Sequence, residues 1–232
     1  MGLLLNCEKL SKFYGPFPAV VNIDLNIESD KIIGLLGPNG SGKTTFMKLA
    51  AGLLTPTMGN ISILGNPVGE ETKKIVSYLP DSTYLSNWMT VKDAVNFFKD
   101  FYFDFSEIKA YEMLENLKIN PKIKLKALSK GNREKVQLIL VMARDARLYL
   151  LDEPIAGVDP AARDYILDTI ITNRSPGSSV IISTHLIYDI EPVLTDFLFI
   201  NRGEIFMQNT VEAARNYYGK SIDQLFREVF RC

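Results

Sequence analysis

A glycine-rich segment near the start of the chain has the residue types and spacing of a phosphate-binding loop. It fits the pattern G-x-x-x-x-G-K-[ST] and reads Gly37-Pro38-Asn39-Gly40-Ser41-Gly42-Lys43-Thr44. Glycines let the backbone fold closely around an anion, so that successive N–H groups point at phosphate oxygens. Lys43 would reach the β- and γ-phosphates, and the Thr44 hydroxyl would bind Mg²⁺. The segment therefore predicts a nucleoside triphosphate site.

Two consecutive acids farther along the chain would supply the remaining groups that such a site needs. Asp152 and Glu153 follow the apolar run 148–151, which predicts a short buried strand. Asp152 would hold Mg²⁺ directly or through water, and Glu153 is placed to polarise an attacking water as a general base. The alternative is a strand-end turn fixed by Pro154. That alternative would be favoured for the acids alone, but their pairing with the glycine-rich loop favours catalysis.

The single histidine of the chain, His185, follows another apolar run at 180–184. A lone histidine after a strand is usually structural or exposed. Here it ends an expected core strand of a nucleotide-binding fold, where its ring could contact the γ-phosphate and the attacking water. We therefore interpret His185 as a third catalytic residue, beside Glu153 and Lys43.

The order of the expected elements explains how these groups could meet. The run 31–36 predicts a buried strand before the loop, and a helix is expected from Thr45 to residue 51. Alternation of apolar and polar residues predicts two antiparallel strands at the N-terminus. The carboxyl ends of parallel strands form the usual ligand site of an α/β sheet. Strands are expected at 3–10, 20–28, 59–65, 75–79, 147–152, 179–183, 197–201 and 204–208, and later helices at 160–172, 211–217 and 221–231.

Between residues 84 and 132 the strand signals disappear and two helical patterns follow, near 91–102 and 106–117. This segment is rich in Phe, Tyr and Leu, which indicates a helical insertion rather than a linker. We therefore predict an α/β fold: a phosphate-loop NTPase core with an N-terminal antiparallel β-subdomain and an inserted helical subdomain. A single domain is expected over 1–232, with 1–83 and 133–232 forming the core and β-subdomain and 84–132 the helical subdomain.

Composition limits the other possibilities. Of the 232 residues 47% are hydrophobic and 23% charged, and the net charge is −1, so no basic excess suggests a nucleic-acid partner. Cys7 and Cys232 form no metal or redox motif. No apolar run approaches the length of about 18 residues that spans a bilayer. We expect a cytoplasmic protein that would act on a membrane only through a partner, as a peripheral subunit on the inner face.

The chain resembles the nucleotide-binding subunits of ATP-binding cassette (ABC) transporters along nearly its whole length. Segments 37–44 and 148–153 match the family's two nucleotide motifs, and segment 128–133 lies where its Leu-Ser-Gly-Gly-Gln signature belongs. The resemblance implies that Tyr14 stacks on adenine and that segment 156–159 contacts an opposite subunit. It also implies an ATPase that uses ATP and Mg²⁺ and works with a membrane-spanning permease subunit.

The same resemblance implies a head-to-tail dimer of two ATPase subunits, identical or different, with ATP held between them. Each nucleotide would lie between the loop of one chain and Ser129 and Gly131 of the other. Ser129 is a plausible N-cap, so the helix that follows would present N–H groups to a phosphate. The chain departs from the family's pattern at three positions. Two of them lie in the signature, where Lys130 replaces a glycine and Asn132 replaces a glutamine. The third is Asp81, which stands where the family usually has a glutamine and could still bind Mg²⁺.

Three classes of function remain open from the sequence. The leading hypothesis is an ATPase subunit that drives a separate membrane subunit, and the short C-terminal tail resembles that of small bacterial exporters. The second is a soluble ABC-type ATPase acting on a protein or nucleic-acid assembly. The third is a phosphate-loop kinase for a small metabolite, which would need neither Ser129 nor His185. The transported substrate cannot be read from the sequence, because specificity resides mainly in the permease.

Overall fold

A six-stranded sheet runs through the core in the order β10-β9-β3-β8-β7-β6. The computed structural model describes residues 2–230, without the side chains of residues 161 and 162. Every neighbouring pair from β9 to β6 is parallel, so the carboxyl ends of these five strands lie at one edge. The strands are β3 (Ile32–Leu36), β6 (Val76–Leu79), β7 (Leu148–Asp152), β8 (Ser179–Thr184), β9 (Asp196–Asn201) and β10 (Glu204–Thr210).

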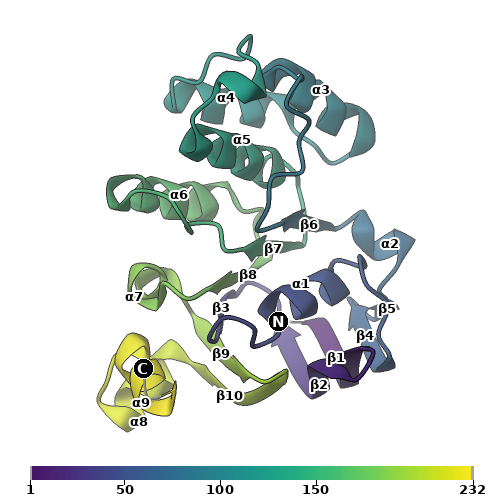
Figure 1. Ribbon diagram of the computed structural model, residues 1–232, viewed down its shortest axis with the longest axis vertical. Helices are drawn as coiled ribbons and strands as arrows, with labels where there is room; N and C mark the ends of the chain where they lie inside the picture. The colour runs from purple at the N-terminus through teal and green to yellow at the C-terminus, as the bar shows by residue number, and fades with distance from the viewer. Residues whose placement is uncertain (1, 231–232) are drawn as a thin grey trace.

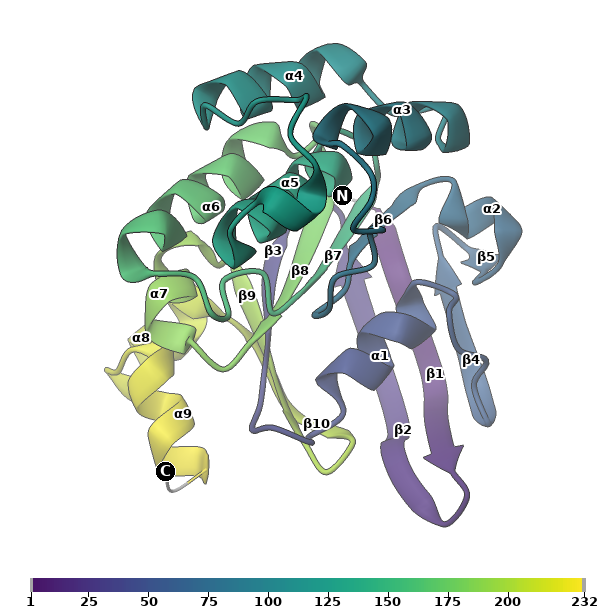
Figure 2. The same cartoon turned by 45° about the horizontal axis from the view of Figure 1, so that its top comes forward.

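A second, antiparallel sheet is formed by the N-terminal part of the chain in the order β2-β1-β4-β5. Its first two strands extend farther than predicted, because the hairpin stays paired until Tyr14 faces Phe17 across the turn at Gly15. Helix α1 (Lys43–Ala50) lies between the two sheets (Figure 2) and buries Phe46, with other apolar residues, in their shared core. The strands are β1 (Leu3–Tyr14), β2 (Phe17–Glu28), β4 (Met58–Ile63) and β5 (Asn66–Pro67).

Three helices form a layer beside the β6 and β7 end of the large sheet, at the top of Figure 1. They are α3 (Val91–Phe101), α4 (Glu107–Asn116) and α5 (Lys130–Met142). Each begins at a polar N-cap whose hydroxyl accepts a hydrogen bond from a backbone N–H three residues later. Helix α5 continues across the boundary proposed after residue 132, and the division into subdomains stays a prediction.

The remaining helices cover the other parts of the sheet. They are α2 (Glu70–Lys73), α6 (Pro160–Asn173), α7 (Ile187–Ile190), α8 (Val211–Tyr218) and α9 (Ile222–Phe230). Short 3₁₀ turns occur at Leu125–Ala127 and Glu191–Val193. The predicted α/β class is confirmed, whereas β5 and α2 had no clear sequence signal. The predicted last helix reaches Arg231, which lies outside the described residues, as do Met1 and Cys232.

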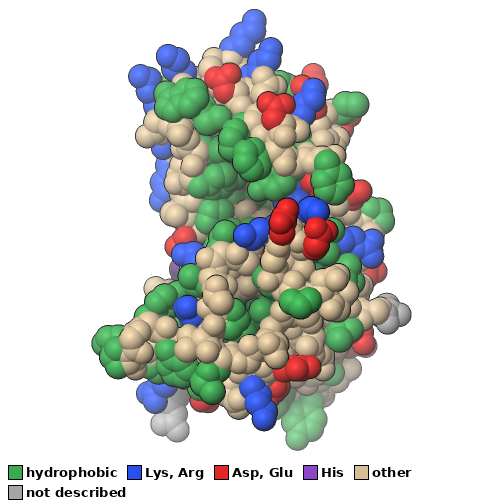
Figure 3. Space-filling model, turned by 90° about the vertical axis from the view of Figure 1, so that its right-hand side faces the viewer, with side chains coloured by type: hydrophobic (Ala, Val, Ile, Leu, Met, Phe, Trp, Pro, Cys, Tyr) green, Lys and Arg blue, Asp and Glu red, His purple; other side chains and the backbone are tan. Residues whose placement is uncertain are grey.

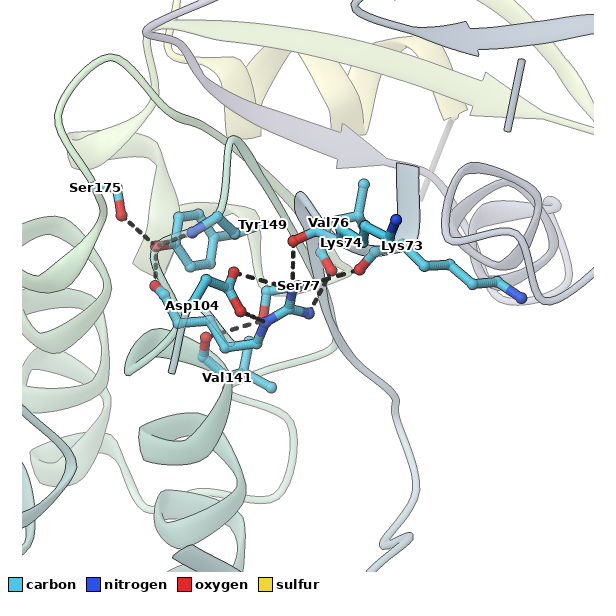
Figure 4. Close-up of polar contacts among 10 residues, drawn as sticks. Lys73, Lys74, Val76, Ser77, Asp104, Val141, Tyr149 and Ser175 are labelled. Carbon is cyan, nitrogen blue, oxygen red and sulfur yellow. Dashed lines mark hydrogen bonds and ion pairs between the residues drawn. The ribbon is translucent and has the colours of Figure 1, made fainter. Parts of the chain in front are cut away.

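Arg144, just after α5, joins the helical layer to the edge strand β6 by contacting Asp104, Lys74 and Val76, which are labelled in Figure 4. Its guanidinium donates to both carboxylate oxygens of Asp104 at 3.0 Å. It also donates to the carbonyl oxygens of Val76 at 2.7 Å and Lys74 at 2.8 Å, and its carbon lies 3.9 Å from the ring centroid of Tyr102. The ion pair is buried, with side-chain exposures of 3% for Arg144 and 7% for Asp104. The contact fixes the position of β6, whose carboxyl end leads to Asp81.

Candidate active site

The glycine-rich loop connects the carboxyl end of β3 to the start of α1, as predicted. Gly37 has no space for a side chain, since a Cβ there would lie 2.3 Å from the carbonyl oxygen of Ile200. Gly42 adopts φ 108°, and a Cβ there would lie 2.3 Å from the carbonyl oxygen of Ala19. Both glycines are therefore required by close backbone approach and, for Gly42, by the left-handed backbone. The N-terminus of α1 follows at once, which suits anion binding.

The side chain of Lys43 folds back onto the first two residues of this loop. Its Nζ donates to the carbonyl oxygens of Gly37 at 2.8 Å and Pro38 at 3.1 Å. Burial lowers the pKa of Lys43, and the negative charges of Glu153 and Asp152 oppose that change. A cation with these neighbours can bind β- and γ-phosphate oxygens, whose charge would replace the weaker carbonyl contacts.

The loop, Asp81 and Glu153 line one cavity of about 280 Å³. The loop contributes residues 39–45 to this lining, and Ala19 of β2 also lines the cavity. The structure thus brings together the predicted phosphate-binding residues, the expected general base and the aspartate that replaces the family's glutamine. Gly37 and Pro38, the first two residues of the loop, are connected to this cavity through the hydrogen bonds that Lys43 donates to their carbonyl oxygens.

Asp152 ends β7 and is 1% exposed. Its Oδ1 accepts a hydrogen bond from Ser183, which lies opposite in the register of β7 and β8. Its Oδ2 is buried and has no hydrogen-bond partner among the described residues. Burial raises the pKa of Asp152, while the hydroxyls of Ser183 and Thr44 act in the opposite direction.

These residues fit Mg²⁺. An oxygen without a partner on a buried carboxylate, with the Thr44 hydroxyl nearby, is the hard oxygen set that Mg²⁺ prefers. Within residues 2–230 no group of three or more His, Cys, Asp or Glu side chains is assembled to hold a metal. A metal here would therefore take its other ligands from phosphate oxygens and water, as Mg²⁺ usually does at nucleotide sites.

Glu153 and His185 face each other at the ends of neighbouring strands. The His185 Nδ1 lies 3.2 Å from Oε1 and 3.1 Å from Oε2 of Glu153. Glu153 has φ 51°, a left-handed conformation that is costly for a residue with a side chain. Its N–H donates to the carbonyl oxygen of Ser183 at 2.9 Å, and this bond holds the strained backbone in place. The pair can orient a carboxylate toward water beside a γ-phosphate.

One residue of segment 128–133 lines a second cavity, of about 340 Å³, whose walls also include Asp81, Asp152 and Glu153. Lys130 lines it, with Nζ 3.8 Å from Oε1 of Glu134. Ser129 accepts from the N–H of Asn132 at 3.3 Å, which confirms the predicted N-cap. A Cβ at Gly131 would meet no atom of the described chain within 4 Å, so a close approach from outside is possible there. Neither Ser129 nor Gly131 is among the described residues that line the loop cavity of its own chain.

Tyr14 lies at the end of β1 and is 47% exposed. The Lys12 Nζ stands 5.7 Å from its ring centroid. The structure places Tyr14 on the hairpin that reaches the loop through Ala19, although it is not among the described residues lining the 280 Å³ cavity.

Sequence reasoning missed Ser183 and Tyr78 as neighbours of the site. The Ser183 hydroxyl bonds Asp152, and Tyr78 lies on β6 next to β7. A signal for Ser183 existed, because parallel strands that end at one edge place Ser183 opposite Asp152. No comparable local pattern marked Tyr78.

A phosphate loop, a strand-end acid pair and a histidine at the carboxyl ends of a parallel sheet define a phosphate-loop nucleoside triphosphatase. The family described as ABC transporter matches residues 20–156, more than half of the chain. The chain belongs to the ATP-binding subunits of ABC transporters and is an ATPase.

Similarity to two curated relatives spans most of each chain. The SkfA peptide export ATP-binding protein SkfE of Bacillus subtilis is 33% identical over 189 residues, 78% of this chain and 79% of SkfE. The lipopolysaccharide export system ATP-binding protein LptB of Haemophilus influenzae is 31% identical over 224 residues, 92% of this chain and 93% of LptB.

Solved structures share the fold. The structure of an ATP-binding subunit of an ABC transporter superposes with a TM-score of 0.87 at 26% identity, covering 98% of this chain and 99% of that one. A dimeric bacterial ABC transporter cassette has a TM-score of 0.80 at 20% identity, covering 89% of this chain and 98% of that one. Within the described part of the chain, no helix has both the length and the apolar character needed to cross a bilayer.

Proposed function

We propose that this ATPase powers a separate membrane-spanning permease in export, from the cytoplasmic face of the membrane. The observation that carries the catalytic part is the convergence of the phosphate loop, Asp81 and Glu153 on one cavity. Asp152 interacts with Thr44 and His185 with Glu153, and both of these partners line that cavity. SkfE and LptB are named as export subunits and match this chain over most of their length, which supports export.

In the proposed reaction the chain's own groups divide into binding and catalysis. Residues 37–45 bind the triphosphate, and Lys43 neutralises charge on its β- and γ-phosphates. Mg²⁺, held by Thr44 and Asp152 with Asp81 nearby, would neutralise charge on the phosphate oxygens. Glu153 takes a proton from the attacking water. His185 holds the Glu153 carboxylate in position through the contact at 3.1 Å.

We assign two further groups to nucleotide recognition. Tyr14 stacks on the adenine base. Ser129 and Gly131, at the N-terminus of α5, contact the nucleotide of a second ATPase subunit. The second subunit is needed because Ser129 and Gly131 do not line their own chain's loop cavity among the described residues. A cassette with the same fold has been solved as a dimer, which supports the presence of a second subunit.

The permease would dock in a largely apolar cavity of about 390 Å³ between the helical layer and the core, which we call the groove. Figure 3 shows hydrophobic side chains gathered on this face, between the helical part above and the core below. Leu53, which lines the groove, is 56% exposed. The groove is lined by Lys48, Ala51, Leu53, Lys73, Val76, Ser77, Tyr78, Pro80, Tyr84, Phe98, Tyr102, Val141 and Arg144.

Glu153→Gln tests this assignment. The amide keeps the shape of the carboxylate but loses its basicity, so hydrolysis should fall by roughly 10²-fold or more. ATP should still bind, and an ATP-dependent dimer should become visible by light scattering. Adding Ser129→Arg should return that dimer to monomer. Hydrolysis at the wild-type rate in Glu153→Gln would remove Glu153 from the mechanism. The proposed permease partner is tested by purifying this chain from mild detergent and identifying the proteins that co-purify with it. If no membrane protein co-purifies, this part of the proposal is contradicted.

A further inference from the structure

Tyr78 lines the groove and also lies on the strand next to the one that ends at Asp152. It lies on β6, and its ring lines the groove beside Pro80 and Tyr84. In the register of β6 and β7 it stands opposite Leu150, two residues before Asp152. Side chains two residues apart on a strand share a face, so Tyr78, Leu150 and Asp152 project from the same side of the sheet.

Two buried polar atoms on that face have no hydrogen-bond partner in the part of the chain that the structure describes. The Tyr78 hydroxyl and Oδ2 of Asp152 are both shielded from solvent, and neither has a hydrogen-bond partner within residues 2–230. Burial raises the pKa of the Tyr78 hydroxyl, and the negative charges of Asp152 and then Asp81 raise it further. A buried hydroxyl and a buried carboxylate oxygen without partners are each costly, and a hydrogen bond between them would remove both costs.

We propose that Tyr78 is a positioning residue that links the groove to the metal site by donating a hydrogen bond to Oδ2 of Asp152, directly or through one water. The inference rests on the proposed function, because it takes Asp152 as the Mg²⁺ ligand. Tyr78 touches the ligand rather than the metal. It fixes the direction in which the carboxylate faces the phosphate loop. Because its ring also forms part of the groove wall, an occupant of the groove changes the position of the hydroxyl and therefore the metal site.

The test measures metal affinity rather than turnover. Mn²⁺ serves as a paramagnetic probe for Mg²⁺, and electron paramagnetic resonance follows its binding to the protein–ADP complex. Tyr78→Phe removes only the hydroxyl. Loss of a group that orients a metal ligand typically costs 10–100-fold in affinity, so we expect Mn²⁺ to bind at least about 10-fold more weakly. Tyr84→Phe is the matched control, because it removes a hydroxyl from the same groove and should leave Mn²⁺ affinity unchanged. Thermal unfolding of each variant checks that the fold is kept.

The groove part is tested by partly filling the groove. Leu53→Trp adds bulk at an exposed groove residue and should change Mn²⁺ affinity at least about threefold in the parent protein. The same substitution in the Tyr78→Phe background should have little effect, because the connecting hydroxyl is gone.

Wild-type Mn²⁺ affinity in Tyr78→Phe would overturn the inference. Equal effects of Leu53→Trp in both backgrounds would overturn the connection to the groove. A wild-type protein that binds ADP but never hydrolyses ATP would instead overturn the proposed function, so the two failures are distinguishable.

Discussion

Replacing Arg144 by Met should be among the most destabilising single changes in this chain. Met approximates the length of the side chain and keeps apolar contact with the Tyr102 ring, but it removes every donor. Asp104, 7% exposed, would lose both charge-assisted hydrogen bonds, and the carbonyl oxygens of Val76 and Lys74 would lose theirs. Breaking a buried pair by removing one partner typically costs about 3–5 kcal/mol, and we expect a loss of unfolding free energy in that range.

The companion change, Asp104→Asn, should cost less. Arg144 would keep its two shorter carbonyl contacts, at 2.7 and 2.8 Å, and the amide oxygen of the replacement side chain can still accept one hydrogen bond from the guanidinium. The double variant, Arg144→Met with Asp104→Asn, leaves no unpaired charge. It should therefore be more stable than the sum of the single losses predicts, with a coupling free energy of about 1–3 kcal/mol.

Urea unfolding followed by circular dichroism measures these differences, with all variants compared at one pH and salt concentration. Lys99→Met is the control, because the Lys99–Glu107 pair joins α3 to α4 at 2.6 Å but lies at the surface. It should have a much smaller effect than Arg144→Met. Two results would refute the view that this buried pair holds the helical layer to β6. One is a loss of unfolding free energy below about 1 kcal/mol in Arg144→Met, and the other is strict additivity of the losses in the two single variants.

Three further predictions follow from other parts of the molecule. Tyr14→Ala should weaken ATP binding by on the order of 1–3 kcal/mol but leave inorganic tripolyphosphate binding unchanged; equal loss for both ligands in calorimetry would contradict base stacking. Asp81→Gln removes a negative charge beside Asp152 and should change the Mg²⁺ dependence of ATP binding. If that dependence is unchanged, Asp81 does not lie near the metal. Burial, and secondarily Asp24, raises the pKa of the Cys7 thiol to about 12 from 9.0. The unfolded chain therefore loses this proton first, and stability should fall between about pH 9 and pH 12, by at most about 1.4 kcal/mol per pH unit, with no such slope from this residue below pH 9. Cys7→Ala should lack that slope in urea unfolding, and an identical slope would show that other groups cause it.

The residues of the phosphate loop could be predicted because they lie at fixed spacing within a short, continuous segment. Gly37 and Gly42 mark a backbone that approaches other chain segments too closely for a Cβ, and Lys43 and Thr44 follow at fixed spacing. The acid pair was readable for a similar reason, since a short apolar strand ends at Asp152. Glu153 meets the loop in one cavity because β3 and β7 are both parallel to β8, so that their carboxyl ends lie at one edge of the sheet.

The contacts that depend on distant segments could not be predicted. Asp104 and Arg144 are 40 positions apart, and each reads in the sequence as an ordinary loop charge. The hydroxyl of Tyr78 matters only because β6 lies beside β7, which the sequence does not specify. The short elements β5 and α2 have too few residues for a periodic pattern.

The position of β6 at the end of the six-stranded sheet has a consequence for self-association. An edge strand presents unpaired backbone groups that can recruit a strand from another molecule. The carbonyl of Ile75, the residue before β6, is used toward β7, whereas that of Val76 in β6 is occupied by Arg144. The Ser77 hydroxyl is bonded to the carbonyl of Val141, which ties the same strand to α5. The residues that fasten the helical layer to the sheet therefore also protect the chain from edge-to-edge aggregation.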